Sequence, residues 1–293
     1  KGENIGGLQK EPYKGRQTGT RIRWLPDLAV FTDIDIPLSY YTDVLKRQAV
    51  VNPGVRFILR DQDGRGFAEQ EFYYEHGIGD YVAELAGEDT LTPVQVWSAE
   101  RVGRDRADKP DYKVRLHVAL CFSNKLSLIE YYHNSSHLEH GGSPERAVKV
   151  ATVAQIDAWL RQNGKYLKNE SKISFQDVED CLVLVSSSFS TQTSYENQTK
   201  KSITNKFVYE CMTDFLKHQL EVYFVENPDD AARIAEQVLI NKRSRENAEK
   251  TRLNLKKKLA GTLDMTNRIQ EFVDCRSKDP GKREIYIVEG KSA

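Results

Sequence analysis

The sequence predicts an α+β fold. Segments with the alternating apolar and polar residues of strands fall mainly within residues 21–132, whereas long segments with helical spacing fill residues 203–259. Strands and helices do not alternate regularly, so repeated βαβ units are not expected. Strands first and helices afterwards are typical of α+β proteins.

Length and composition indicate a globular protein without a membrane span. The chain has 293 residues, enough for two domains or for one domain with parts of its neighbours. Its hydrophobic content of 39% is ordinary. Apolar runs such as residues 181–185 are far shorter than the roughly 20 residues of a spanning helix. Because the first residues contain no apolar core of a signal peptide, we expect a cytoplasmic protein.

The cysteines and histidines indicate neither a disulfide framework nor a metal site. The four cysteines are widely spaced and form no Cys-x-x-Cys pair, a pattern typical of a reduced protein. His133, His137 and His140 lie close together in a polar segment. Because no Cys or carboxylate pattern accompanies them, a loop is favoured over a zinc site.

The first 88 residues contain the patterns of a strand, a helix, a hairpin and a second helix. Residues 21–25 alternate as a strand should and are followed by Pro-Asp. Residues 37–51 have apolar side chains near helical spacing, ended by Asn-Pro-Gly. Strands over 55–60 and 67–74 flank an Asp-Gly-Arg-Gly turn, which predicts a hairpin. A short helix is expected over 77–85.

The next segments predict a second group of strands followed by a helix. Apolar positions alternate in 94–99, 113–122 and 126–132, with a charged loop over 102–111. A Ser-Pro-Glu sequence, with Ser as N-cap and Pro at the first helical position, begins a helix over 143–162.

The remaining chain is dominated by two long helices. A continuous apolar run over 181–185 predicts a fully buried strand, and residues 186–199 form a polar loop. Helical spacing continues over 203–225, and Asn-Pro-Asp-Asp begins another helix over 228–259. That helix is about 48 Å long at about 1.5 Å per residue, which suits a strut better than a core element. A last strand is expected over 284–288.

The polar loop before the first long helix contains the best candidate site. Gln198, Thr199, Lys200 and Lys201 lie where we expect that helix to begin. Backbone N–H groups at a helix N-terminus bind anions, and lysine acts as a point charge on a phosphate. The alternative is that these residues only cap the helix.

The second long helix contains a local surplus of basic residues. Residues 241–259 include eight Lys or Arg against two Glu, although the chain as a whole is balanced at 43 basic and 43 acidic residues. Such a stripe is a candidate phosphate-facing surface, and a solvated helix face explains it equally well. The candidate DNA contacts are Lys242, Arg243, Arg245, Lys256, Lys257 and Lys258.

Five segments resemble one protein family. Gln198-Thr199-Lys200 resembles the QTK loop in the transducer domain of type IIA DNA topoisomerase ATPase subunits, the B subunits of bacterial gyrase and topoisomerase IV. Residues 18–27, 45–54 and 72–78 resemble the last motif, the following helix and the closing segment of the GHKL ATPase domain. Residues 274–293 resemble the entry to the Toprim domain. The five segments follow the family's order and together span nearly the whole chain.

The resemblance implies a division into domains. Residues 1–88 are expected to be the C-terminal part of a GHKL ATPase sandwich. Residues 89–258 are expected to be a transducer domain, with a ribosomal-protein-like α+β fold, a left-handed βαβ crossover and a long C-terminal helix. Residues 259–283 would be a linker, and 284–293 the first strand of a Toprim domain.

The resemblance also implies roles for single residues. Gln198 and Lys200 would reach the γ-phosphate of ATP as catalytic and nucleotide-binding residues. Thr20 would help to bind adenine, and Glu289 would be a Mg²⁺-binding carboxylate of the Toprim domain. Lys291 departs from the family, which usually has Asp there, and a cation at this place opposes Mg²⁺ electrostatically.

The implied full-length protein is an ATP-dependent type II DNA topoisomerase. It would couple ATP binding and hydrolysis to strand passage through double-stranded DNA, with a DNA-cleaving A-type subunit in a heterotetramer and homodimerisation through the ATPase domains. The sequence does not choose between gyrase and topoisomerase IV. This stretch is expected to be inactive alone, since it lacks an ExxxN helix and a Gly-rich ATP lid. The alternative is a non-catalytic nucleic-acid-binding module that uses the basic helix and the transducer fold.

Overall fold

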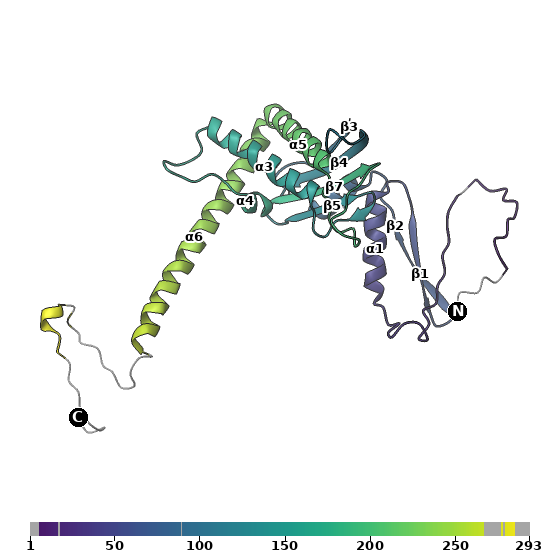
Figure 1. Ribbon diagram of the computed structural model, residues 1–293, viewed down its shortest axis with the longest axis horizontal. Helices are drawn as coiled ribbons and strands as arrows, with labels where there is room; N and C mark the ends of the chain where they lie inside the picture. Colours follow the sequence, from purple (N-terminus) through teal and green to yellow (C-terminus); the bar gives the residue numbers. More distant parts are fainter. Residues whose placement is uncertain (1–5, 17, 89, 267–276, 278, 285–293) are drawn as a thin grey trace, which may run out of the picture. The chain divides into compact units, whose positions relative to one another are not determined.

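The computed structural model describes residues 6–16, 18–88, 90–266, 277 and 279–284, with Asp63 and residues 260–266 described by their backbone only. The chain divides into two compact units, Lys1–Val44 and Leu45–Ala293. Each unit is described by itself. Sheets and helices are both present, so the α+β class is confirmed (Figure 1).

The described part of the first unit has little regular structure before helix α1 (Leu38–Val51), which begins there as predicted. The strand predicted over 21–25 is wrong, because these residues are in an irregular, mostly exposed conformation. An alternating pattern becomes a strand only when its backbone groups pair with a neighbour. Here Trp24 instead contacts the Tyr41 ring, with 5.4 Å between ring centroids.

The second unit begins with a hairpin and a short helix, both as predicted. Strand β1 (Phe57–Asp63) pairs antiparallel with β2 (Gly66–Phe72), and Asp63 lies opposite Gly66 at the turn. Gly64 has a φ of 57°, a left-handed conformation that glycine adopts without steric cost. The hairpin leads into helix α2 (Ile78–Ala86).

A five-stranded mixed sheet forms the centre of the second unit (Figure 1). Its strands are β3 (Gln95–Gly103), β4 (Tyr112–Phe122), β5 (Leu128–His133), β6 (Ser136–His137) and β7 (Leu182–Ser190). Their order is β3-β4-β7-β5-β6, with β5 and β7 parallel and the other neighbours antiparallel. The predicted strands are confirmed, but β3 and β7 run on into segments that we expected to be loops.

Helices complete the unit. They are α3 (Ser143–Gln162), α4 (Phe175–Glu179), α5 (Lys206–Glu226) and α6 (Pro228–Thr266), with a 3₁₀ turn η1 at Pro280–Lys282. Helices α3 and α4 connect the parallel strands β5 and β7, as a βαβ crossover requires. The N-cap of α3 is Gly142, one residue before the predicted Ser143. Pro280–Lys282 lies within the expected linker, and residues 285–293 lie outside the described residues.

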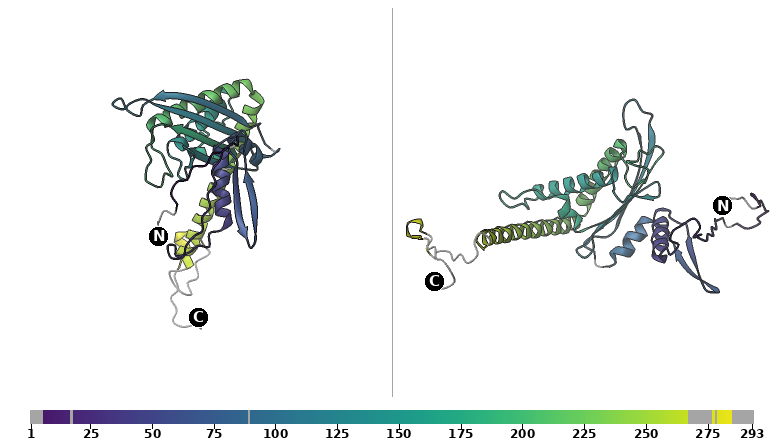
Figure 2. Two further views of the ribbon diagram at one scale, coloured as in Figure 1. Left: turned by 90° about the vertical axis from the view of Figure 1, so that its right-hand side faces the viewer. Right: turned by 60° about the horizontal axis from the view of Figure 1, so that its bottom comes forward.

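The sheet is buried on both faces where β4 and β7 run side by side. Leu116, Leu120 and Leu184 belong to a core that also includes apolar residues of α3, α5 and α6. Figure 2 shows α3 and α5 together against one side of the sheet. Helix α2 packs against β4 and β7 as well, and Cys121 is completely buried. The burial of β4 therefore alternates in its first half and becomes continuous in its second.

Helix α6 is anchored to the domain by a cluster of ion pairs that includes buried and partly exposed side chains. The side chain of Lys242 is 0% exposed, and its Nζ lies 3.1 Å from both Glu170 Oε1 and Glu246 Oε1. Arg243 Nη2 lies 3.0 Å from Glu170 Oε2. We call this cluster, which also contains the pair described next, the α6 joint.

The second half of the α6 joint attaches α6 to α4. Arg245 Nε donates to Oδ1 of the fully buried Asp177 at 2.7 Å, and Arg245 Nη2 donates to Oδ2 at 3.1 Å. Asp177 also accepts from the backbone N–H of Ser174, at the start of α4, at 2.7 Å. Each charge in the joint has a partner, as burial requires. Beyond the joint, residues 247–259 of α6 are exposed.

The α6 joint makes a testable contribution to stability. Arg243, hydrogen-bonded to Glu170, lowers the pKa of this carboxyl to about 2. The Glu170→Gln variant is expected to lose about 3 kcal/mol of unfolding free energy at pH 7, because a buried ammonium loses a charged partner. The stabilisation is present above the unfolded-state pKa of about 4.3 and is lost as the pH falls towards 2.

Denaturant unfolding at pH 7 and pH 3 tests this expectation. The difference between wild type and Glu170→Gln should shrink by more than half at pH 3. The matched control is Glu210→Gln, whose exposed carboxylate pairs with Lys206 one turn away on α5. This control is expected to change stability by less than about 0.5 kcal/mol. An equal loss for Glu170→Gln at both pH values contradicts the ion-pair origin of the effect.

Candidate functional site

The predicted site lies on a hairpin that spans residues 194–204, here called the 194–204 hairpin. Its two sides are joined by a β-bridge between Tyr195 and Ile203. The N–H of Thr204 donates to Ser194 O at 2.8 Å, and the N–H of Glu196 donates to Ser202 O at 3.0 Å. The chain therefore reverses direction here before α5 begins.

The tip of the hairpin is a tight turn held by Asn197. Its Oδ1 accepts from the N–H of Thr199 at 3.1 Å and from the Thr199 hydroxyl. Its backbone carbonyl accepts from the N–H of Lys200 at 3.3 Å. Lys200 has a φ of 58°, a left-handed conformation that costs a non-glycine residue about 1 kcal/mol. The Asn197 side chain therefore stabilises a turn that places Lys200 in an unusual backbone conformation.

The side chains at the tip face solvent. Gln198 and Lys200 are exposed, and the Lys200 ammonium lies 5.6 Å from the centroid of the Tyr195 ring. Lys201, in contrast, pairs with Glu139 at 2.5 Å. Within the part of the chain that the structure describes, no carboxylate forms an ion pair with Lys200. Its ammonium is therefore available to an external anion.

The expectation that Gln198–Lys201 begins a helix is wrong. Helix α5 begins at Lys206, because the bridge between Tyr195 and Ile203 keeps the preceding residues extended. The start of α5 is also occupied already. Asp105, from the loop between β3 and β4, accepts from the N–H of Phe207 at 2.8 Å. A carboxylate thus accepts from one of the free N–H groups at the helix N-terminus, and an anion at the hairpin tip meets side chains rather than a helix dipole.

Asn205 fixes one end of the hairpin. This residue is 1% exposed, and its Oδ1 accepts from the N–H of Ser194 at 2.7 Å. Its Nδ2 lies 3.0 Å from Asp105 Oδ2, and its carbonyl accepts from the Ser143 hydroxyl at 2.8 Å. Asn205 therefore joins the hairpin, α3 and the cap of α5. Neither Asn205 nor Asp105 belongs to a motif, and only their distant partners reveal their role.

Gly142 allows the segment before α3 to lie directly against the hairpin. It has a φ of 85°, and a Cβ at this position would lie 2.3 Å from Ile203 O. The N–H of Ser143 donates to the same carbonyl at 2.9 Å. A side chain larger than hydrogen does not fit between these two backbones.

The remaining predicted residues are distributed over the chain. Thr20 lies in the first unit, exposed and without regular structure. Glu289 and Lys291 lie outside the described residues. His133 is buried at the end of β5 instead of lying in a loop. No group of three His, Cys, Asp or Glu side chains in the described ranges is arranged to hold a metal ion.

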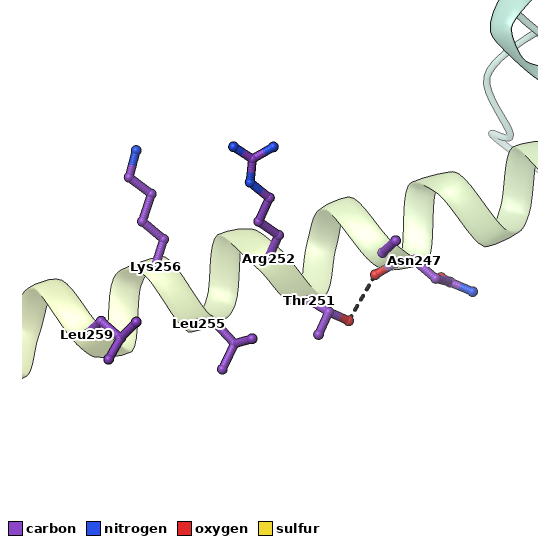
Figure 3. Close-up of a pocket in the computed structure, with 7 residues that line it drawn as sticks. Asn247, Thr251, Arg252, Leu255, Lys256 and Leu259 are labelled. Carbon is purple, nitrogen blue, oxygen red and sulfur yellow. Dashed lines mark hydrogen bonds between the residues drawn. The ribbon is translucent and has the colours of Figure 1, made fainter.

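The basic segment of α6 separates into two parts. Lys242 is buried, so the prediction that it faces phosphate is wrong, and Arg243 and Arg245 belong to the α6 joint. Lys256, Lys257 and Lys258 lie on the exposed part of the helix. A shallow groove runs along this part, lined by Asn247, Ala248, Thr251, Arg252, Leu255, Lys256 and Leu259. Figure 3 shows Arg252 and Lys256 on one side, with Leu255 and Leu259 on the other.

Comparison with known proteins decides the family. The sequence model described as DNA gyrase B matches residues 77–254, more than half of the chain. The chain belongs to the DNA gyrase B family. The resemblance to the ATPase subunits of type IIA topoisomerases is thereby confirmed.

Individual relatives agree with this assignment. The DNA gyrase B protein of Metamycoplasma arthritidis is 31% identical over 293 residues, which cover 99% of this chain and 44% of the relative. The corresponding protein of Mycoplasmoides gallisepticum is 28% identical over 297 residues, which cover 98% of this chain and 45% of the relative. The chain thus spans less than half the length of these curated relatives.

Solved structures show the same fold. The 43K ATPase domain of Thermus thermophilus gyrase B, in complex with an aminocoumarin, superposes with a TM-score of 0.57 and 20% identity. That match covers 78% of this chain and 59% of the other. The topoisomerase IV ATP-binding domain of Francisella tularensis gives a TM-score of 0.55 at 20% identity, covering 75% and 57%. Among the described residues, no helix has both the length and the apolar character needed to cross a bilayer.

The role of Asn205 can be tested by truncation. Asn205→Ala removes the acceptor for Ser194 and leaves Asp105 with one donor fewer, so the unfolding free energy is expected to fall by about 2 kcal/mol. Denaturant unfolding measures this change. The control Asn163→Ala removes an exposed side chain with one bond to Trp159 O and should have a smaller effect. Equal losses for the two variants contradict a joining role for Asn205.

Proposed function

We propose that this chain is the coupling part of the ATPase subunit of an ATP-dependent type II DNA topoisomerase. The observation that carries the proposal is the ammonium of Lys200, which pairs with no described carboxylate, at the tip of a hairpin with a fixed turn in a chain of the DNA gyrase B family. The full-length protein would couple ATP binding and hydrolysis to DNA strand passage.

The proposed domain assignment follows the family. Residues 1–88 are the end of a GHKL ATPase domain, 89–258 a transducer domain, 259–283 a linker and 284–293 the start of a Toprim domain. The strands β5 and β7 with α3 and α4 supply the βαβ crossover of the transducer, for which we propose a left-handed connection. The compact units divide at residue 44 instead of 88, so the second half of α1, the β1–β2 hairpin and α2 belong with the sheet.

The hairpin tip has the chemistry to bind the terminal phosphate of ATP. Lys200 supplies a positive charge and Gln198 supplies amide N–H donors, and both side chains are exposed. ATP supplies the γ-phosphoryl group, whose negative charge a positioned ammonium neutralises during transfer. Thr20 is proposed to contact adenine. Mg²⁺ binding is proposed for Glu289, and no described carboxylate cluster takes over that role.

The proposed partners also follow from the family. They are double-stranded DNA, a DNA-cleaving A-type subunit and a second copy of the ATPase subunit, in a cytoplasmic heterotetramer. Within this chain, α6 is the element proposed to transmit the nucleotide state, because its first half is anchored by the α6 joint and its exposed half extends beyond it.

The role of Lys200 can be tested in the full-length protein. Lys200→Ala is expected to lower ATP turnover about 100- to 1,000-fold, since it removes a charge that stabilises the transition state. Steady-state ATPase assays measure this. Lys206→Ala is the matched control: it removes an exposed lysine six residues away that pairs with Glu210. Near-normal turnover of Lys200→Ala would falsify the proposal.

The DNA-binding role of α6 makes a separate prediction. Reversing the charge of Lys256, Lys257 and Lys258 to Glu in the full-length protein should weaken DNA binding and reduce the salt-dependence slope by about 3, since each phosphate contact contributes about 0.9. Lys242→Met, which changes a buried residue of the α6 joint, should leave the slope unchanged. If the triple variant retains the wild-type slope, the exposed half of α6 is not a phosphate contact.

A further inference from the structure

A buried histidine lies at the end of β5, beside the root of the 194–204 hairpin. His133 is 0% exposed, and its Nδ1 lies 2.8 Å from the Ser188 hydroxyl. Its Nε2 lies 3.0 Å from the Ser190 hydroxyl and 3.1 Å from the Thr193 hydroxyl. Burial lowers the pKa of the imidazole to about 4, so the ring is neutral at pH 7. A neutral ring donates through one nitrogen and accepts through the other.

The neighbouring residue Asn134 attaches to the same root. Its Oδ1 accepts from the N–H of Ser190 at 3.0 Å, and its Nδ2 donates to the Thr193 hydroxyl at 3.0 Å. Asn134 has a φ of 48°, which turns the chain back immediately after β5. The carbonyl of Ser135 accepts from Gln48 Nε2 at 3.0 Å. The end of β5 is therefore tied to α1 and to the segment that leads into the hairpin.

The geometry does not fit a catalytic or metal-binding role for this histidine. Ser188 and Ser190 are 2% and 3% exposed, so no substrate reaches their hydroxyls. The Ser190 hydroxyl also donates to Gln192 O at 2.7 Å, which removes the proton that a nucleophile would pass to His133. The partners of His133 are hydroxyls, whereas a metal site needs further His, Cys or carboxylate ligands.

The hydrogen bonds of His133 lie where they can set the position of the 194–204 hairpin. Thr193 is the last residue before the 194–204 hairpin, and Lys200 is seven residues further along the chain. Asn205, the residue after the hairpin, accepts from the N–H of Ser194 and so joins the two ends of the hairpin. Removing the His133 contacts would leave that bond in place and would remove the buried support of Ser190 and Thr193, which precede the hairpin. The expected result is a change in hairpin position while the sheet stays intact.

We propose that His133 is a positioning residue that fixes the root of the 194–204 hairpin and thereby places Lys200 on the γ-phosphate of ATP. The inference rests on the proposed function of Lys200. A lysine displaced by about 1 Å still carries its charge but loses its alignment with the transferred group, at a cost of about 10- to 100-fold in rate. His133 acts through Lys200 and does not touch the nucleotide.

The test compares nucleotides that differ by the γ-phosphate. In the full-length protein, His133→Ala is expected to lower ATP turnover about 10- to 100-fold. It should weaken binding of a non-hydrolysable ATP analogue about tenfold and leave ADP affinity unchanged. His133→Gln, which keeps one donor and one acceptor, should restore part of the loss. The matched control is His117→Ala, an exposed histidine on β4 of the same sheet.

A double-mutant cycle with Lys200→Ala measures whether the two residues act together. If His133 acts through Lys200, the analogue affinity of the double variant equals that of Lys200→Ala alone. Additive losses, or a parallel fall in ADP affinity, overturn the inference and leave a purely structural role. Thr193→Val removes, at nearly constant volume, the hydroxyl that lies within hydrogen-bond distance of His133, Asn134 and Ser190. It replaces His133→Ala in the cycle if that variant does not fold.

The outcomes separate this inference from the proposed function. If Lys200→Ala retains near-normal turnover, the proposed function fails and the inference fails with it. If Lys200→Ala is inactive while His133→Ala and Thr193→Val keep wild-type turnover and analogue affinity, only the inference fails. A loss specific to the ATP analogue, together with non-additivity, supports both.

Discussion

The pairing of β7 on both of its edges is the constraint on which the second unit depends. Leu182–Val185 are completely buried; all four residues pair with β4, and Val183–Val185 also pair with β5. Helix α4, which contributes Asp177 to the α6 joint, leads into one end of β7, and the hairpin root follows the other end. Nine residues of strand span about 30 Å. A close-packed interior of this kind transmits a displacement instead of absorbing it.

Charge in this protein is divided between buried and exposed groups. The equal numbers of acidic and basic residues give no overall field. Locally, the basic segment of α6 loses half of its predicted phosphate contacts to the α6 joint. Besides Glu246 on the same helix, two of the acids responsible lie far away in sequence: Glu170 is 72 residues from Lys242, and Asp177 is 68 residues from Arg245. A count of charges along one helix cannot identify partners at such separations, so only the exposed lysines remain as candidate contacts.

Local patterns predicted those parts of the fold that local forces decide. The β1–β2 turn, the strand β4 and the helices other than α4 follow from turn residues and apolar spacing, whereas the short helix α4 was not predicted. The predicted end of β7 was wrong because residues 186–190 have the polar composition of a loop, although Ser186, Ser188 and Ser190 are buried. The hydroxyls of Ser188 and Ser190 are tolerated in the interior because both lie within hydrogen-bond distance of His133. The prediction for residues 21–25 is wrong for the opposite reason: they have the pattern of a strand, but no strand of the described chain pairs with them.

At the candidate site, too, the local motif predicted the residues but not the structure around them. Gln198 and Lys200 could be chosen from their motif, but the helix predicted to begin there is absent, since α5 begins only at Lys206. The N–H of Phe207, in the first turn of α5, is already bonded to Asp105. Anion binding at the tip therefore depends on one ammonium and one amide, without the contribution of a helix dipole. A single exposed lysine is screened by water and salt. Lys200 can act on a phosphate only if its ammonium is held in position. The hydrogen bonds of Asn197, Asn205 and His133, which fix the hairpin, therefore matter more than the charge alone.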